Sequence, residues 1–166
     1  MRADARRNRQ RVLDTAYAVF ATDGIGVPID EVARRAGVGA GTVYRHFPTK
    51  EALVEAVVRD RIGAMTAKAR SGVDFGGFFA FMVEASLANR AVAEALAGGG
   101  YRVPADAEAA LQAAFADLLR HAQRTGDVHP DITPDDLNSL VVGCVATARQ
   151  RGDTALVRIV LAGLRP

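Results

Sequence analysis

The chain has 166 residues, of which 49% are hydrophobic, so it can bury a core as one domain or as a small module joined to a larger one. No stretch reaches the ~20 apolar residues of a membrane-spanning helix, and a start with five arginines in eleven residues is unlike a secretory signal. The single cysteine, Cys144, excludes an internal disulfide and a zinc cluster of thiolates, and we therefore expect a cytoplasmic location.

Charge is distributed unevenly along the chain. Residues 1–70 contain 13 Lys and Arg against 8 Asp and Glu, a balance of +5, whereas residues 71–166 contain 8 against 11, a balance of −3. The net charge of +2 hides this asymmetry. A basic first part is what a module that binds a polyanion would show.

The first seventy residues predict four helices, because apolar residues recur at helical spacing and β-branched alternation is nearly absent. Gly24 and Gly37 are the expected stops of the first two helices. Pro28 suits the first turn of the second helix, and Thr49 is a candidate cap for the fourth. The expected ranges are about 4–22, 28–36, 40–46 and 50–69.

Four more helices are predicted in the remainder of the chain. Asp74 is the expected cap of the fifth helix, which ends at the GGG run of residues 98–100. Thr133 and Asp136 form a pattern like a capping box before the seventh helix. The expected ranges are about 75–97, 105–124, 134–151 and 153–164. The fold class expected from these patterns is all-α.

Residues of about 28–47 predict a DNA-binding helix-turn-helix, because two short helices joined by a Gly-bearing turn of three or four residues lie inside the basic segment. At 100° per residue, Val43 and Phe47 share one face of the third helix and are expected to pack on neighbouring apolar side chains. Those neighbours are Val32, Ala33 and Val38. The opposite face presents Gly41, Thr42 and Arg45.

The exposed face and the segment after it carry donors suited to DNA. Arg45 can form two hydrogen bonds with guanine, and Thr42 can contact a base or a phosphate. Tyr44, His46 and Lys50 are placed to reach the sugar-phosphate backbone. Lys50 also stands at the start of a helix, whose free N–H groups favour a phosphate.

Other arginines can add attraction that does not depend on sequence. Arg34 and Arg35 would attract the DNA in this way if they face the duplex. The arginines before Val12 would do the same if they are held near the duplex. The alternative for the arginine-rich start is a frayed, solvated arm.

The segment "VFATDGIGVPIDEVARRAGVGAGTVYRHFPTKEALVEAV" resembles the DNA-binding domain of TetR/AcrR-type transcriptional regulators, and the match extends over residues 8–60. The resemblance implies that Thr42, Tyr44, His46 and Lys50 contact DNA and that Arg45 occupies a variable reading position. Many members have a threonine where this chain has Pro28, so that phosphate contact should be absent. Gly39 and Ala40 replace a commoner Ser-Lys, which leaves few side chains at the start of the recognition helix.

Beyond about residue 70 the resemblance is weak. It implies domains of about 1–50, a helix-turn-helix unit, and 51–166, a larger helical unit that binds a small-molecule inducer and forms a homodimer through its last two helices. Gly143 and Gly163 would allow close approach in such a dimer. Candidate pocket residues for an apolar inducer are Phe78, Phe79, Met82, Phe115 and Cys144. The same aromatic cluster can equally be ordinary core, and Cys144 a small core residue.

The function expected from these features is a transcriptional regulator, a repressor that binds a double-stranded, pseudo-palindromic operator and is released by the inducer. It is expected to need no cofactor and no membrane. Alternatives from other classes are a helical interaction protein that does not bind DNA and a small helical enzyme using His46 or His121. His121, His129 and Cys144 lie on different elements, which speaks against a metal site.

Overall fold

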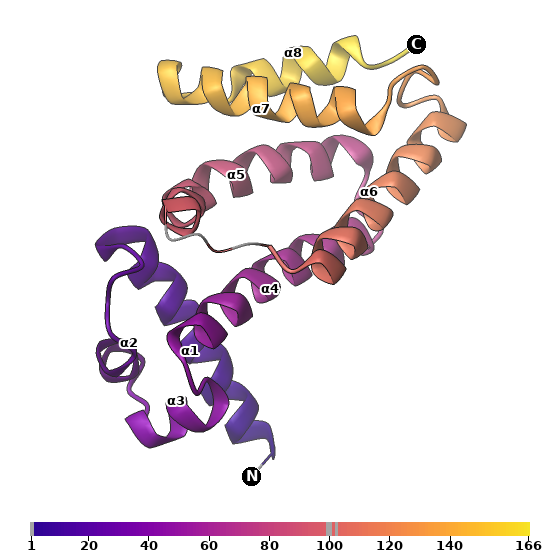
Figure 1. Ribbon diagram of the computed structural model, residues 1–166. Coiled ribbons are helices and arrows are strands. Elements are labelled where there is room, and N and C mark those ends of the chain that lie inside the picture. Colours follow the sequence, from indigo (N-terminus) through magenta and orange to yellow (C-terminus); the bar gives the residue numbers. More distant parts are fainter. Residues whose placement is uncertain (1, 99–100, 102) are drawn as a thin grey trace. The chain divides into compact units, whose positions relative to one another are not determined.

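The structure is a computed structural model that describes residues 2–98, 101 and 103–166 (Figure 1). These residues form eight helices and no strand, which confirms the all-α prediction. The helices are α1 (Arg2–Asp23), α2 (Ile29–Ala36), α3 (Ala40–His46), α4 (Lys50–Ala69), α5 (Phe75–Gly98), α6 (Ala105–Thr125), α7 (Pro134–Arg151) and α8 (Ala155–Gly163).

Most helix boundaries follow from local sequence signals. Thr49 caps α4, since its Oγ1 accepts a hydrogen bond from the N–H of Ala52 at 3.2 Å. Thr133 and Asp136 form the expected capping box of α7. The predicted stop of α5 falls partly on Gly99 and Gly100, which lie outside the described residues.

Contacts divide the chain into two compact units. Unit 1 comprises residues 1–62 and 89–105, and unit 2 comprises residues 63–88 and 106–166. The boundary expected at residue 50 stays a prediction, because grouping by contacts does not show which parts fold alone. Both α4 and α5 begin in one unit and end in the other.

Unit 1 is built around α1, α2, α3 and the first part of α4. Its core contains Phe20, Leu13 and Val43, each at most 1% exposed. Val43 and Phe47 lie in the same cluster as the apolar residues of α2, as predicted. A fully buried aliphatic or aromatic side chain contributes about 1.5–3 kcal/mol relative to exposure, so these contacts hold α3 on α2.

One part of unit 1 was not expected from the sequence. Val92, near the end of α5, is 5% exposed and belongs to the core cluster of α1 to α4. Tyr101 packs against the same cluster, and the hydroxyl of Tyr17 on α1 donates a hydrogen bond to Asn89. The segment 89–105 is therefore attached to the helix-turn-helix unit by both apolar and polar contacts.

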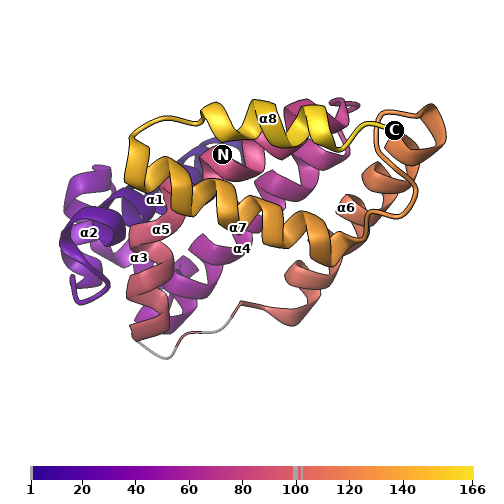
Figure 2. The same cartoon turned by 90° about the horizontal axis from the view of Figure 1, so that it is seen from above.

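Unit 2 has an aromatic core. Phe78 and Phe79 are fully buried, and the ring of Phe78 lies 5.6 Å from that of Phe115, measured between centroids. Helices α7 and α8 lie side by side along their length (Figure 2). Each of these two helices exposes one large apolar side chain, Val142 on α7 at 60% and Ile159 on α8 at 65%.

In the part of the chain that the structure describes, no helix combines the length with the apolar character needed to cross a membrane.

Candidate nucleic-acid interface

The turn between α2 and α3 has the geometry that its glycines predict. Gly37 ends α2 with φ of +62°, a left-handed conformation that a side chain would strain. The N–H of Val38 then bonds the carbonyl of Ala33 at 3.1 Å, which directs the chain into α3. Only three residues, 37–39, separate the two helices. This is a helix-turn-helix with a tight, hydrogen-bonded turn.

The recognition helix α3 has one buried face and one exposed face. Val43 is 0% exposed and Phe47, directly after the helix, is 2% exposed, whereas Tyr44 is 43% exposed. Arg45 and His46 are also exposed, and Thr42 is half-buried. The division between packing and presented residues predicted from 100° spacing is therefore confirmed. Their contact with DNA stays a prediction.

The start of α3 is open to solvent. A Cβ added to Gly39 or Gly41 would meet no atom within 4 Å. Gly39, at the cap position, supplies no side-chain cap to the helix. The backbone can therefore approach a partner closely here, although it offers few side chains to it.

Arg45 and Thr42 are linked to each other on the exposed face. The Nη2 of Arg45 donates to Oγ1 of Thr42 at 3.2 Å, and its Nε donates to the carbonyl of Gly41 at 3.1 Å. The guanidinium is thus held over the first turns of α3. The two predicted reading residues are thus bonded to each other, and a DNA base that bound to them would have to replace this hydrogen bond.

The predicted backbone contacts flank this arrangement. Lys50 is half-buried at the first position of α4. Tyr44 lies beside Asp30 of α2, and the pKa of its hydroxyl is raised, first by desolvation and then by the Asp30 carboxylate. Sequence reasoning missed Asp30, because nothing in a local pattern shows which α2 side chain faces Tyr44.

Arg35, another predicted DNA contact, is held by carboxylates of its own unit. Its Nη1 lies 2.6 Å from Oδ2 of Asp23, at the end of α1, and its Nε lies 2.6 Å from Oε1 of Glu31. Glu31 also accepts from Nε and Nη2 of Arg34, both at 2.7 Å. Arg35 thereby joins α1 to α2. A DNA contact by Arg35 stays a prediction, and it would require phosphate to compete with two carboxylates.

The hydrogen bonds from Arg34 and then Arg35 lower the pKa of Glu31 from 4.5 to about 2. Because the folded value is the lower one, Glu31 favours the folded state above pH 4.5 and loses that effect as the pH falls toward 2. We expect Glu31→Gln to flatten the loss of stability over this range, measured by urea unfolding at several pH values. A pH profile identical to that of the native chain would contradict the assignment.

The five candidate pocket residues lie together in unit 2, but in packed surroundings. Phe78, Phe79, Met82, Phe115 and Cys144 all belong to one apolar cluster. Cys144 is 1% exposed, and burial raises the pKa of its thiol.

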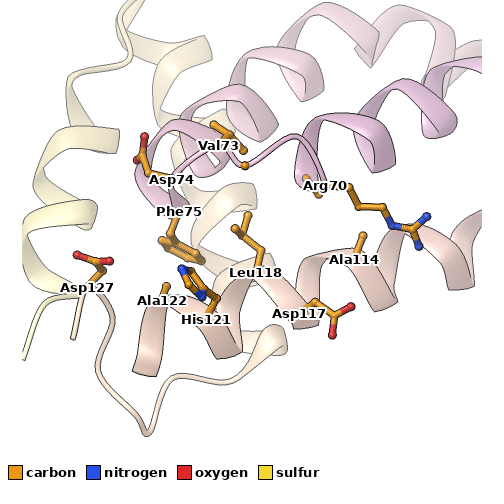
Figure 3. Close-up of a pocket in the computed structure, with 12 residues that line it drawn as sticks. Arg70, Val73, Asp74, Phe75, Ala114, Asp117, Leu118, His121, Ala122 and Asp127 are labelled. Atoms are coloured by element: carbon orange, nitrogen blue, oxygen red, sulfur yellow. The ribbon is translucent and has the colours of Figure 1, made fainter. Parts of the chain in front are cut away.

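None of these five residues lines the cavity of unit 2 that is shown in Figure 3. This cavity has a volume of about 520 Å³ and lies between the α4–α5 loop and α6. Apolar side chains including Phe75 and Leu118 form part of its wall, with charged side chains around them. The charged and titratable residues are Arg70, Asp74, Asp117, His121 and Asp127. The described residues contain no group of three or more His, Cys, Asp or Glu that could hold a metal ion.

Together, the exposed α3, the tight turn and the all-helical architecture place the chain in the class of helix-turn-helix proteins, whose second helix is suited to bind DNA. Two family descriptions match the chain: bacterial regulatory proteins of the tetR family over residues 12–57, and the C-terminal domain of SbtR-like transcriptional regulators over residues 72–166. The chain belongs to the TetR family of transcriptional regulators.

Solved structures agree with this assignment over nearly the whole chain. A TetR transcription regulatory protein from Mycobacterium vanbaalenii is 43% identical, with 99% of each chain covered and a TM-score of 0.82. A TetR regulator from Streptomyces coelicolor is 29% identical, covering 95% of this chain and 98% of its own, with a TM-score of 0.77. The Escherichia coli regulator UidR is 26% identical in an alignment of 146 positions that covers 80% of this chain and 74% of UidR.

Proposed function

We propose that the protein is a homodimeric repressor in the cytoplasm that binds a pseudo-palindromic duplex and releases it when a small molecule binds unit 2. The observation that carries the DNA-binding part is α3, which is anchored by buried Val43 and Phe47 and presents a polar face to solvent. In a helix-turn-helix the second helix enters the major groove. Two copies related by two-fold symmetry would then read two half-sites.

The proposed contacts divide into two kinds. Arg45 and Thr42 read bases, since their donors lie together on the exposed face of α3. Tyr44, His46 and Lys50 hold the phosphate backbone on either side. Gly41 allows the backbone to approach the duplex.

A second copy of the chain is the proposed occupant of the outer surface of α7 and α8. Val142 and Ile159 are exposed on these two helices, and Gly143 and Gly163 have no atom within 4 Å of an added Cβ. Apolar side chains next to glycines favour close packing between helices of two subunits.

A small apolar molecule that releases the DNA has two places to bind in unit 2, the aromatic cluster and the cavity beside α6. Phe78 and Phe79 are fully buried, so an apolar ligand among them would have to displace packed side chains. The existing cavity has a charged rim instead. In either case, α4 passes from unit 2 into unit 1, and a shift of α4 would change the separation of the two α3 helices in a dimer.

Arg45→Ala and Lys50→Ala are expected to weaken DNA binding in different ways. Loss of Arg45 should reduce discrimination between bases by about 1–3 kcal/mol at one position of the site. Loss of Lys50 should weaken binding to all duplexes alike and make it less dependent on salt. The measurement is a titration of each variant with a duplex selected from a random pool and with an unrelated duplex.

Gln112→Ala serves as the control for this comparison, because Gln112 is an exposed residue of α6 in unit 2. If both variants bound like the control, α3 would not be the DNA-contacting element, and a helical interaction protein would be the better interpretation. The family consists of transcriptional regulators, and we propose no catalytic role for His46 or His121.

A further inference from the structure

Arg9 is held differently from its neighbouring arginines on α1. Arg7 pairs with Asp4, and Arg11 donates to the side-chain oxygen of Asn8 at 2.6 Å. The guanidinium of Arg9 instead lies over the ring of Phe47, 5.5 Å from its centroid. No carboxylate of the described residues pairs with it. Its charge therefore lies over an aromatic ring, and no described carboxylate neutralises it.

The ring that holds Arg9 stands at the junction between α3 and α4. Phe47 directly follows the last residue of α3, and its ring lies 6.1 Å from that of His46. Lys50 begins α4 three residues later. Arg9 therefore brings a cation from α1 to the junction of α3 and α4, where the chain carries the two predicted backbone contacts His46 and Lys50.

A phosphate at this junction needs such a cation, because the helix terminus alone is already engaged. Glu51, in the first turn of α4, has a lowered pKa, caused first by a hydrogen bond from its own backbone and then by one from the Thr49 side chain. The Glu51 carboxylate thus accepts from the N–H of Glu51, and Oγ1 of Thr49 accepts from that of Ala52, so two N–H groups that would otherwise favour a bound anion are engaged. The charge of a phosphate is then matched by side-chain cations.

We infer that Arg9 is a phosphate contact of the DNA-binding unit, positioned by the ring of Phe47. The inference rests on the proposed binding of duplex DNA. An arginine normally loses much side-chain conformational entropy when it binds a partner. Because the contact with Phe47 already restricts Arg9 in the free protein, less entropy is lost when DNA binds. The planar guanidinium suits two phosphate oxygens, and since phosphates are the same at every step, the contact carries no sequence information.

The test compares Arg9→Ala with Arg7→Ala in the full chain. Both variants remove one positive charge from an exposed position of α1, two residues apart. For Arg9→Ala we expect affinity to fall about tenfold for selected and unrelated duplexes alike. The slope of log K against log salt should become shallower by about 0.9 for each protomer bound. For Arg7→Ala, whose charge is paired with Asp4, we expect less than a third of either change.

Phe47→Leu tests the positioning role. It keeps an apolar side chain in the core but removes the ring. In the Phe47→Leu protein, Arg9→Ala should reduce DNA affinity no more than Arg7→Ala does. Thermal unfolding of the Phe47→Leu protein shows at which temperatures it is folded, and the affinities are measured within that range. An undiminished effect of Arg9→Ala would overturn the role given to Phe47.

The outcomes separate this inference from the proposed function. If the native chain binds duplex with strong salt dependence and Arg9→Ala behaves like Arg7→Ala, Arg9 contributes only general attraction and the inference is wrong. If the native chain binds no duplex at low salt, the proposed function itself fails.

Discussion

Ile159→Arg is expected to convert the proposed dimer into monomers and to weaken binding to a duplex with two half-sites by at least about a hundredfold. Ile159 is 65% exposed on α8 and Val142 is 60% exposed on α7, so both are free to be covered by a second copy. A charge placed in an apolar interface must lose its hydration without gaining a partner. Each recognition helix would then bind its half-site alone. The affinity gained when two joined subunits bind both half-sites at once would be lost.

Sedimentation measures the oligomeric state, and duplex titration measures the affinity. Gln112→Arg is the matched control, since it adds the same charge at an exposed position of α6. The control should remain dimeric and bind normally. A dimeric Ile159→Arg protein would show that the outer surface of α7 and α8 is not the subunit interface.

Phe78→Ala is expected to lower the free energy of unfolding by about 3–5 kcal/mol. The side chain is fully buried and contacts the rings of Phe81 and Phe115, at centroid distances of 6.2 and 5.6 Å. Removing it would leave a cavity that a close-packed interior fills only in part. Urea unfolding with circular dichroism gives the difference in free energy.

Phe81→Ala provides the comparison, because Phe81 is only half-buried on the same helix. Its loss should cost clearly less. If instead Phe78→Ala were nearly neutral, Phe78 would line an open pocket rather than fill the core, and the interpretation of the aromatic cluster as an inducer site would gain support.

The helices were predictable because their signals are local. Thr49 and Thr133 stand directly before α4 and α7 and cap them, and Gly37 follows α2 with the left-handed backbone that glycine tolerates. The two faces of α3 follow from helical spacing alone. The helix-turn-helix could therefore be placed from a short segment of sequence.

Contacts between distant segments were not predictable in this way. The attachment of residues 89–105 to unit 1, the position of Arg9 over Phe47 and the pairing of Arg35 with Asp23 all depend on how separate helices pack. A single sequence contains no periodic signal for such pairs. Arg35 illustrates the consequence, since its place in a basic segment suggested a DNA contact while its partners are acidic groups of its own unit.

The aromatic cluster of α5 shows a second limit. Phe78 and Phe79 occur at a spacing that fits a core and a ligand pocket equally well. Only the packing distinguishes the two, and it places both rings in a filled cluster. The residues around the existing cavity, such as Arg70 and Asp117, carry no pattern that would have singled them out as pocket residues.

The central claim is that α3 of a dimer reads a symmetric duplex. It is tested most directly by titrating the full chain with a duplex recovered from a random pool and with an unrelated duplex, over a series of salt concentrations. We predict a two-fold symmetric recovered sequence, tighter binding to it by a factor of about 10³ or more, and affinities that fall steeply with salt. Recovery of no common sequence, with binding that is weak and indifferent to salt, would contradict the claim.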